Sequence, residues 1–334
     1  MLTAPRRMPT FIATLAAALV LTACGQSDEP AASSNDPETR VATAYALPDD
    51  RAYPEGIALD ARTGDTYVGS YTNGAVYRAA AGATAAEVFL PAGTDGRATA
   101  NGMKVDDRGR LWVTDSTAGV AVYDIATRAL VARFDVPGDA PRFVNDLDFA
   151  PDGTAYLTDS IRSVVYRVTP EQVVAGGNAE LAPVFDLAPH LEPLPEDAFG
   201  INGIVVDPTG RYLLIVDMTG GDLYRIATAP DAAEPVRKVV LNGGDVAHGD
   251  GLDLVDHTLR VAHNTTNTLS RWTMSDDYAT ATLAEQFTDE SLAIPTTLVR
   301  VGDRTLVVAS QFDKGGPMAP GTPTTPFRIV AVRI

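Results

Sequence analysis

The chain has 334 residues, of which 45% are hydrophobic, and this is enough to bury one large core or two modest ones. Its 26 Lys and Arg residues stand against 43 Asp and Glu residues, which gives a formal net charge of −17. Nucleic acid is not an expected partner, because phosphate binding requires clustered Lys and Arg. An acidic surface is compatible with an exported protein and with cation binding.

The N-terminus has the pattern of a targeting signal. Arg6 and Arg7 precede an apolar run at 11–21, which ends in the small residues before Cys24. This resembles a bacterial lipoprotein signal, and the resemblance implies cleavage before Cys24 and a lipid on its sulfur. The mature protein would then be extracytoplasmic and lipid-anchored to a bacterial membrane. The alternative is an ordinary secretory peptide with an incidental cysteine.

The remaining chain divides into a linker and one domain. Residues 24–40 are rich in Ser, Pro, Ala and acidic residues, which predicts a flexible tether after a signal peptide at 1–23. Cys24 is the only cysteine, so the domain at 41–334 has neither disulfides nor cysteine catalysis. No later stretch approaches the ~20 apolar residues of a membrane span.

One sequence pattern recurs along the domain. Residues 145–153 read Asn-Asp-Leu-Asp-Phe-Ala-Pro-Asp-Gly, a strand followed by a turn, and related copies start between 44 (101 to 145) and 57 (145 to 202) residues apart. Each copy continues with further short β-rich runs and no segment of helical period. Four short strands per repeat predict an all-β fold, a six-bladed β-propeller. The copies begin at Glu55, Asn101, Asn145, Asn202 and Asp250, with a degenerate sixth at Pro295.

The two ends of the domain are expected to close the ring. The last copy contains only three strand-like runs, at 297–301, 305–309 and 327–334. The run at 41–47 reads as a strand with no blade of its own. Pairing it with 327–334 would complete the last blade and remove two open edges.

The first residue of each copy is expected at one mouth of the central channel, where the innermost strands begin. Carboxylate and amide oxygens with few positive neighbours suit a divalent cation, most of all Ca²⁺. Each Asn or Asp taken alone has an alternative interpretation, since these residues often satisfy backbone groups at turns. A turn has no need of Glu55, which favours a shared cation site.

The motifs around these positions resemble one protein family. They are Pro54-Glu55-Gly56, Asn145-Asp146, Asn202-Gly203 and Asp250-Gly251, each followed by its hairpin. The family is that of senescence marker protein (regucalcin), gluconolactonase and luciferin-regenerating enzyme, with a more distant likeness to paraoxonase and diisopropyl fluorophosphatase. The resemblance implies a catalytic divalent metal, usually calcium, held by Glu55, Asn145, Asn202 and Asp250.

The resemblance also assigns residues around the metal. Family lactonases often place an Arg two positions before the third-blade Asn, where this chain has Phe143 with Arg142 one step further back. Arg142 is carried over as a substrate contact, and Asn101 is expected to bind substrate or a metal-bound water. Phe199 belongs to a Pro-rich insert at 188–201, which could form an apolar pocket wall with Leu191 and Leu194 or could be surface padding.

The expected activity is hydrolysis of a small lactone or related ester by a protein that acts as a monomer. The metal would polarise the carbonyl, and Asp250 or a water that it activates would be the base or nucleophile. His248 is a candidate proton carrier because its unperturbed pKa is near neutrality, or else a loop histidine without a catalytic duty. Two alternatives stay open: a non-catalytic propeller that keeps the metal and binds a small ligand, glycan or protein, and condensation chemistry of the strictosidine synthase type.

Overall fold

The structure is a computed structural model that describes residues 40–195 and 198–334. These residues all belong to one compact unit. The predictions for the signal peptide, for Cys24 and for most of the tether lie outside the described residues. No helix of the described residues is long and apolar enough to cross a membrane.

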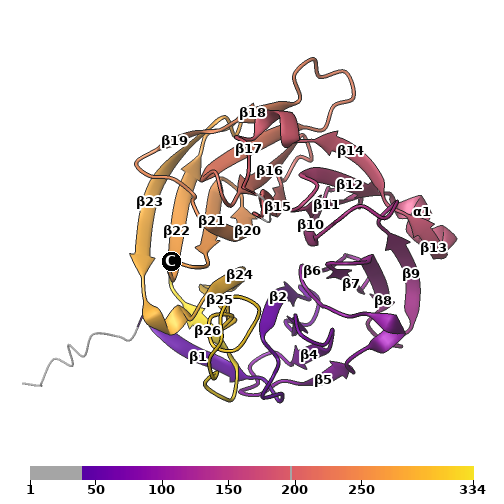
Figure 1. Cartoon of the computed structure of the whole chain (residues 1–334), viewed down its shortest axis with the longest axis vertical. Helices are drawn as coiled ribbons and strands as arrows, with labels where there is room; N and C mark the ends of the chain where they lie inside the picture. The colour runs from indigo at the N-terminus through magenta and orange to yellow at the C-terminus, as the bar shows by residue number, and fades with distance from the viewer. Residues whose placement is uncertain (1–39, 196–197) are drawn as a thin grey trace, which may run out of the picture. The chain divides into compact units, whose positions relative to one another are not determined.

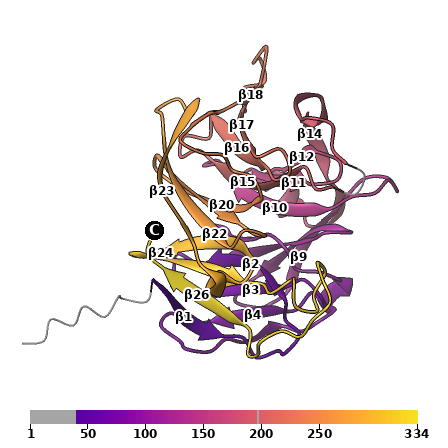
Figure 2. The same ribbon diagram turned by 60° about the vertical axis from the view of Figure 1, so that its left-hand side comes forward.

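Six sheets surround a central channel as the blades of a propeller, which confirms the predicted fold class (Figures 1 and 2). Blade 1 consists of β2 (Pro54–Leu59), β3 (Thr66–Ser70), β4 (Val76–Ala79) and β5 (Glu87–Leu90). Blade 2 consists of β6 (Met103–Val105), β7 (Arg110–Asp115), β8 (Gly119–Asp124) and β9 (Leu130–Asp135). Blade 3 consists of β10 (Val144–Phe149), β11 (Ala155–Asp159), β12 (Val164–Val168) and β14 (Ala182–Asp186).

The second half of the ring repeats this order. Blade 4 consists of β15 (Ile201–Val206), β16 (Tyr212–Asp217), β17 (Asp222–Ala227) and β18 (Val236–Lys238). Blade 5 consists of β20 (Gly249–Val255), β21 (Thr258–His263), β22 (Thr268–Met274) and β23 (Thr280–Thr288). Blade 6 consists of β24 (Pro295–Val301), β25 (Arg304–Ala309), β26 (Arg328–Val332) and β1 (Val41–Ala46).

The ring closes as the sequence predicts. Strand β1 pairs antiparallel with β26, from Val41 opposite Val332 to Ala46 opposite Arg328. Nearer the channel, the Thr296 hydroxyl of blade 6 donates a hydrogen bond to the Glu55 carbonyl of blade 1 at 2.7 Å. The N-terminal strand therefore completes blade 6 and covers the edge of β26, and a hydrogen bond near the channel joins blade 6 to blade 1.

The hydrophobic core consists of six clusters, each packed between two neighbouring blades. Both faces of a blade are therefore buried, which is why its middle strands are continuous apolar runs without alternation. All of β16 except Tyr212 is buried, for example. Fully buried Trp112 and Trp272 fill the space between blades 2 and 3 and between blades 4 and 5.

Two connections depart from the expected four-strand pattern. A short helix, α1 (Pro170–Ala175), follows β12 and begins with a capping box between Thr169 and Gln172. The next strand, β13 (Gly177–Glu180), pairs in parallel with β9 of blade 2. The fourth run of the fourth repeat is divided between two blades, since β18 stays in blade 4 while β19 (Val240–Asn242) pairs in parallel with β23 of blade 5. Both additions cover an outer edge strand of a neighbouring blade.

A β-bulge lies at the start of the innermost strand in most blades. In blade 1, Pro54 is opposite Ser70 but Ile57 is opposite Val68, so one strand gains a residue over its partner. The same shift occurs at the equivalent place in β10, β15, β20 and β24. Bulges re-aim side chains, which explains why polar residues that strands disfavour begin these strands.

The glycines after these polar residues allow the blades to approach one another. A Cβ atom on Gly56 would lie 1.9 Å from the Asn101 carbonyl oxygen, and one on Gly203 would lie 2.2 Å from the Asp250 carbonyl oxygen. Only glycine permits such an approach of neighbouring backbones. The glycines thus keep the ring of polar side chains narrow.

Candidate functional site

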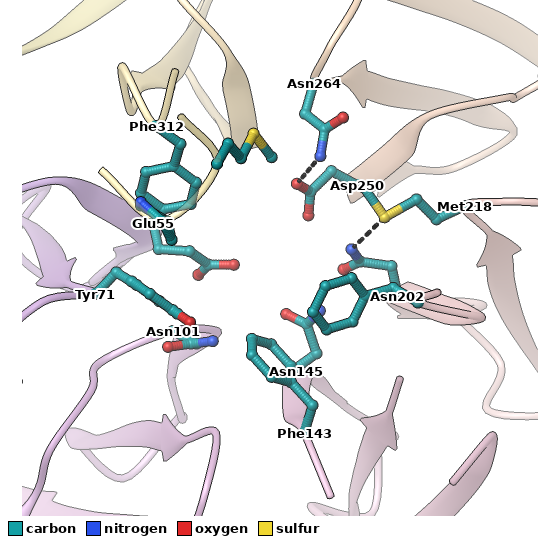
Figure 3. Close-up of a pocket in the computed structure, with 13 residues that line it drawn as sticks. Glu55, Tyr71, Asn101, Phe143, Asn145, Asn202, Met218, Asp250, Asn264 and Phe312 are labelled. Carbon is teal, nitrogen blue, oxygen red and sulfur yellow. Dashed lines mark hydrogen bonds between the residues drawn. The ribbon is translucent and has the colours of Figure 1, made fainter. Parts of the chain in front are cut away.

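The polar residues that begin the repeats meet at one mouth of the channel (Figure 3). They line a cavity of roughly 210 Å³. Its polar lining residues are Glu55, Asn101, Asn145, Asn202, Asp250 and Asn264. Its other lining residues are Tyr71, Phe143, Phe199, Met218, Phe312, Pro317 and Met318. All four predicted metal ligands, and Asn101 and Phe199 as well, are thus brought together.

A second set of residues orients the first set. The Asn145 Nδ2 donates to the Ser160 hydroxyl at 3.0 Å, which leaves the Asn145 Oδ1 facing the cavity (Figure 3). The Asn202 Nδ2 likewise donates to the Met218 sulfur at 3.4 Å. In both amides the nitrogen has a protein partner, so the oxygen is the atom left for a ligand.

Several buried polar atoms at the site have no protein partner. Within the described residues these are the Oδ1 of Asn202 and both side-chain polar atoms of Asn101. Leaving a buried polar group unpaired costs about 1–3 kcal/mol. Unpaired polar atoms at the mouth of the channel are therefore placed to bind a ligand or an ion, which would supply the partner that the protein lacks.

The carboxylates of the site resist ionisation in the absence of a cation. Burial, and after it the charges of Asp250 and Asp146, raise the pKa of Glu55 well above its usual range. Burial raises the pKa of Asp250 to about 8, although the hydrogen bond from Asn264 Nδ2 at 3.0 Å opposes the shift. Repulsion among three buried carboxylates in one narrow space therefore opposes their ionisation, and a divalent cation would relieve that repulsion.

Asp146 is a site residue that the sequence analysis named within a motif but gave no role. It is buried beside the ring, burial raises its pKa to about 6, and nearby Lys104 opposes this shift. The sequence does mark Asp146 as unusual, because four of the other repeats have Gly at the position equivalent to Asp146. These glycines are Gly56, Gly102, Gly203 and Gly251.

A second set of residues that the sequence analysis did not single out follows the second strand of each blade. The residue directly after that strand is 14 (250 to 264) to 16 (55 to 71) positions beyond the first residue of the repeat. Because the two strands pair at this end, this residue lies beside the repeat's first residue. The alignment of the repeats could therefore have predicted that these residues lie near the site. The set is Tyr71, Ser116, Ser160, Met218, Asn264 and Ser310.

Two predicted residues lie outside the cavity lining. His248 is exposed, and its backbone N–H donates to the Met218 carbonyl at 2.9 Å while its carbonyl accepts from the Asn264 N–H at 2.9 Å. Arg142 is also absent from the lining, where Phe143 lies instead. The structure thus gives His248 a backbone position that supports Met218 and Asn264, whereas its side chain does not line the cavity.

The Pro-rich insert contributes less to the cavity than expected. Phe199 lines it, but Leu191 and Leu194 lie against Gly200, and Leu191 packs on the core between blades 3 and 4. The rest of the wall comes from the connection between β25 and β26, which supplies Phe312 and Met318. A wall from this connection was not expected from the sequence.

The donor set fits a hard divalent cation. Two carboxylates and at least two amide oxygens face one space, and Ca²⁺ takes 6–8 oxygen ligands, which leaves positions for water or substrate. Within residues 40–195 and 198–334, no three His, Cys, Asp or Glu side chains form a metal cluster by themselves. A cation would therefore depend on the amides of Asn145 and Asn202 as well as on the carboxylates.

Solved structures of known proteins share the fold. A gluconolactonase from Xanthomonas campestris matches with a TM-score of 0.59 and 16% identity over 88% of this chain and 89% of that chain. A calcium-binding protein, regucalcin, from Agrobacterium tumefaciens matches with a TM-score of 0.59 and 15% identity over 87% and 93% of the two chains. Virginiamycin B lyase from Staphylococcus aureus matches with a TM-score of 0.54 and 12% identity over 88% and 99%. No protein-family model and no curated protein sequence matches this chain.

Proposed function

We propose that the protein is a divalent-cation-dependent hydrolase of lactones or related esters, with its active site at the channel mouth. The observation that carries this proposal is the ring of two carboxylates and oriented amides, with the Asn202 Oδ1 buried and unpartnered. The fold shared with a gluconolactonase and with a calcium-binding regucalcin supports it.

The residues have distinct roles in this proposal. The cation would be held by Glu55, Asn145, Asn202 and Asp250, and Ca²⁺ is the cation that prefers such oxygens. A bound divalent cation supplies Lewis acidity toward a carbonyl oxygen. Asn101 is placed to bind a polar atom of the substrate, since neither of its side-chain polar atoms has a protein partner. 

Asp250 is the proposed base. Its Oδ2 accepts the hydrogen bond from Asn264, which fixes the orientation of the carboxylate in the cavity. Its buried position favours uptake of a proton, because burial raises its pKa to about 8. That pKa belongs to the cation-free site. A bound divalent cation would favour the ionised carboxylate, which is the form that accepts a proton.

The experiment that tests the proposal is a panel of lactones and aryl esters on the purified protein, with Ca²⁺ and with excess chelator. We expect turnover in the presence of Ca²⁺ and a loss of at least about a hundredfold in rate on chelation, the scale of removing one electrostatic contributor. Turnover that survives chelation, or no turnover of any member, would contradict the hydrolase.

A non-catalytic propeller with a bound cation is the second candidate function. One observation favours it: none of the described lining residues is a His, Lys or Arg that could act as a general acid. Saturable ligand binding that depends on Ca²⁺, without any turnover, would select this function.

We also propose that the protein is held at a bacterial membrane by a lipid on Cys24, on the basis of the sequence pattern alone. The Cys24→Ser variant is then expected to move from the membrane fraction to the soluble fraction, because one lipidated residue supplies the anchor. Fractionation by immunoblot measures this. An unchanged distribution would count against the anchor.

A further inference from the structure

The side chains of the cavity are sorted by chemistry along the channel. Glu55, Asn145, Asn202 and Asp250 border both this cavity and a much smaller one of about 10 Å³ beside Asp146. None of the apolar lining residues borders the smaller cavity. The oxygen-bearing groups therefore form the inner end of the site, and the apolar side chains form its outer wall.

Four aromatic rings make most of that wall, and we name them the aromatic arc: Phe312, Tyr71, Phe143 and Phe199 (Figure 3 labels the first three). Their successive ring centroids are 5.4 Å, 6.4 Å and 4.8 Å apart, so the contacts are continuous. The rings come from blades 6, 1 and 3 and from the connection before β15. Met218 and Met318 complete the wall with thioether groups that adapt to a ligand's shape.

The aromatic arc is held in place by hydrogen bonds of its supporting loops. The Gln311 side chain donates to the Thr324 carbonyl at 2.9 Å and accepts from the Thr324 N–H at 2.8 Å, which closes the loop that carries Phe312. The backbone N–H of Phe143 donates to the buried Asp159 carboxylate at 2.9 Å. The wall is thus formed before any ligand arrives, which limits the ordering cost of binding.

The charges of the site select against polar and anionic ligands. The lining residues that the structure describes include two carboxylic acids and no Lys, Arg or His. Because the two carboxylates would neutralise a bound divalent cation, an anion would find no cationic side chain in the lining to pair with. A polyhydroxylated ligand would find partners at the inner end and at the Tyr71 hydroxyl. Its other hydroxyls would face phenyl and thioether groups that do not pair with them, and unpaired buried hydroxyls oppose binding.

We propose that the ligand is a neutral, lipophilic lactone or ester whose carbonyl faces the oxygen-bearing inner end and whose aliphatic or aryl group lies against the aromatic arc. The carbonyl in this assignment rests on the proposed function, whereas the lipophilic group rests on the aromatic arc alone. The cavity of roughly 210 Å³ is larger than the ~150 Å³ apolar cavities that accept benzene. It therefore has room for a ring or a short chain.

The test is calorimetric titration of the purified protein, in Ca²⁺, with γ-lactones that carry unbranched side chains of one to six carbons. Glucono-δ-lactone serves as the polyhydroxylated probe. We expect the affinity to rise about fourfold per added methylene until the cavity is full, as for burial of a CH₂ group. Glucono-δ-lactone is expected to bind at least about tenfold more weakly than the six-carbon member.

A pair of variants connects this trend to the aromatic arc. Phe143 is half-buried, and Phe143→Ala is expected to weaken binding of the six-carbon member about tenfold while leaving the one-carbon member unchanged. Phe185 is also half-buried but lies in β14 outside the cavity, so Phe185→Ala is the matched control and should not alter either affinity.

Three results would overturn the inference: affinities that do not change with chain length, tighter binding of glucono-δ-lactone, or equal effects of Phe143→Ala on all members. Failure of the proposed function looks different. Binding that depends on chain length without any turnover would support the lipophilic ligand class and contradict the hydrolase function. Turnover confined to polyhydroxylated lactones would support the hydrolase function and contradict the lipophilic ligand class.

Discussion

At pH 8, Ca²⁺ at a hundredfold excess over its dissociation constant at that pH is expected to raise the melting temperature by about 5 °C relative to chelated protein. The same Ca²⁺ concentration at pH 5 is expected to raise it by much less. The first number follows from ligand linkage, which gives about 2.7 kcal/mol at that concentration, and from roughly 2 °C per kcal/mol for a domain of this size. The pH dependence follows from the carboxyl groups of the site.

The sign of that dependence comes from Asp250. Without a cation its pKa is about 8, against about 3.9 in an unfolded chain. A carboxyl group with a raised native pKa contributes stability that is complete below about pH 4 and is lost as the pH rises toward 8. The chelated protein should therefore lose stability across this window. Because a cation needs ionised ligands, protons compete with it far more strongly at pH 5 than at pH 8.

Differential scanning calorimetry at both pH values measures the effect. The Glu55→Gln variant should lose most of the Ca²⁺ response, whereas Asp231→Asn, which removes an exposed carboxylate outside the cavity, should keep it. An equal response to Ca²⁺ at pH 5 and pH 8, or none at either, would contradict a cation site built on these carboxyl groups.

The Asp250→Asn variant is expected to lower kcat about 10²–10⁴-fold on a substrate found by the lactone and ester panel, the range for loss of a general base. Asparagine keeps an oxygen at the same place, so weaker Ca²⁺ binding should remain measurable. The hydrogen bond from Asn264 would lose its charged acceptor, and the proposed proton acceptor would be gone.

Glu55→Gln is the comparison, since it removes a charge from the same ring without touching the proposed base. Its main effect should be a higher Ca²⁺ concentration for half-maximal activity, about 10–100-fold, with kcat largely restored at saturation. Steady-state kinetics across a Ca²⁺ series separates the two variants. If high Ca²⁺ rescued both to the same kcat, Asp250 would be a ligand only and the proposed base would be elsewhere.

The blade count, the closure and the convergence of the polar ring follow from local sequence patterns. Strands and turns depend mainly on residues that are neighbours in the chain, and in a repeat protein the same local pattern occurs several times. Once the repeats are aligned, Glu55, Asn145, Asn202 and Asp250 are equivalent positions, and the symmetry of a propeller places equivalent positions around one mouth. The N-terminal strand has no blade of its own and the last blade lacks a fourth strand, so the sequence predicts that the two pair.

The tertiary structure decided what surrounds that ring, because these features depend on contacts between distant parts of the chain. The loop that carries Phe312 takes its shape from bonds such as that of the Tyr53 hydroxyl to the Lys314 carbonyl, across 261 residues of sequence. No local pattern predicts such a contact. The raised pKa of Asp250 has the same origin, since burial by several blades produces it. The repeats determined which oxygens meet, and the irregular loops between them, free of the repeat's constraint, determined that aromatic side chains enclose them.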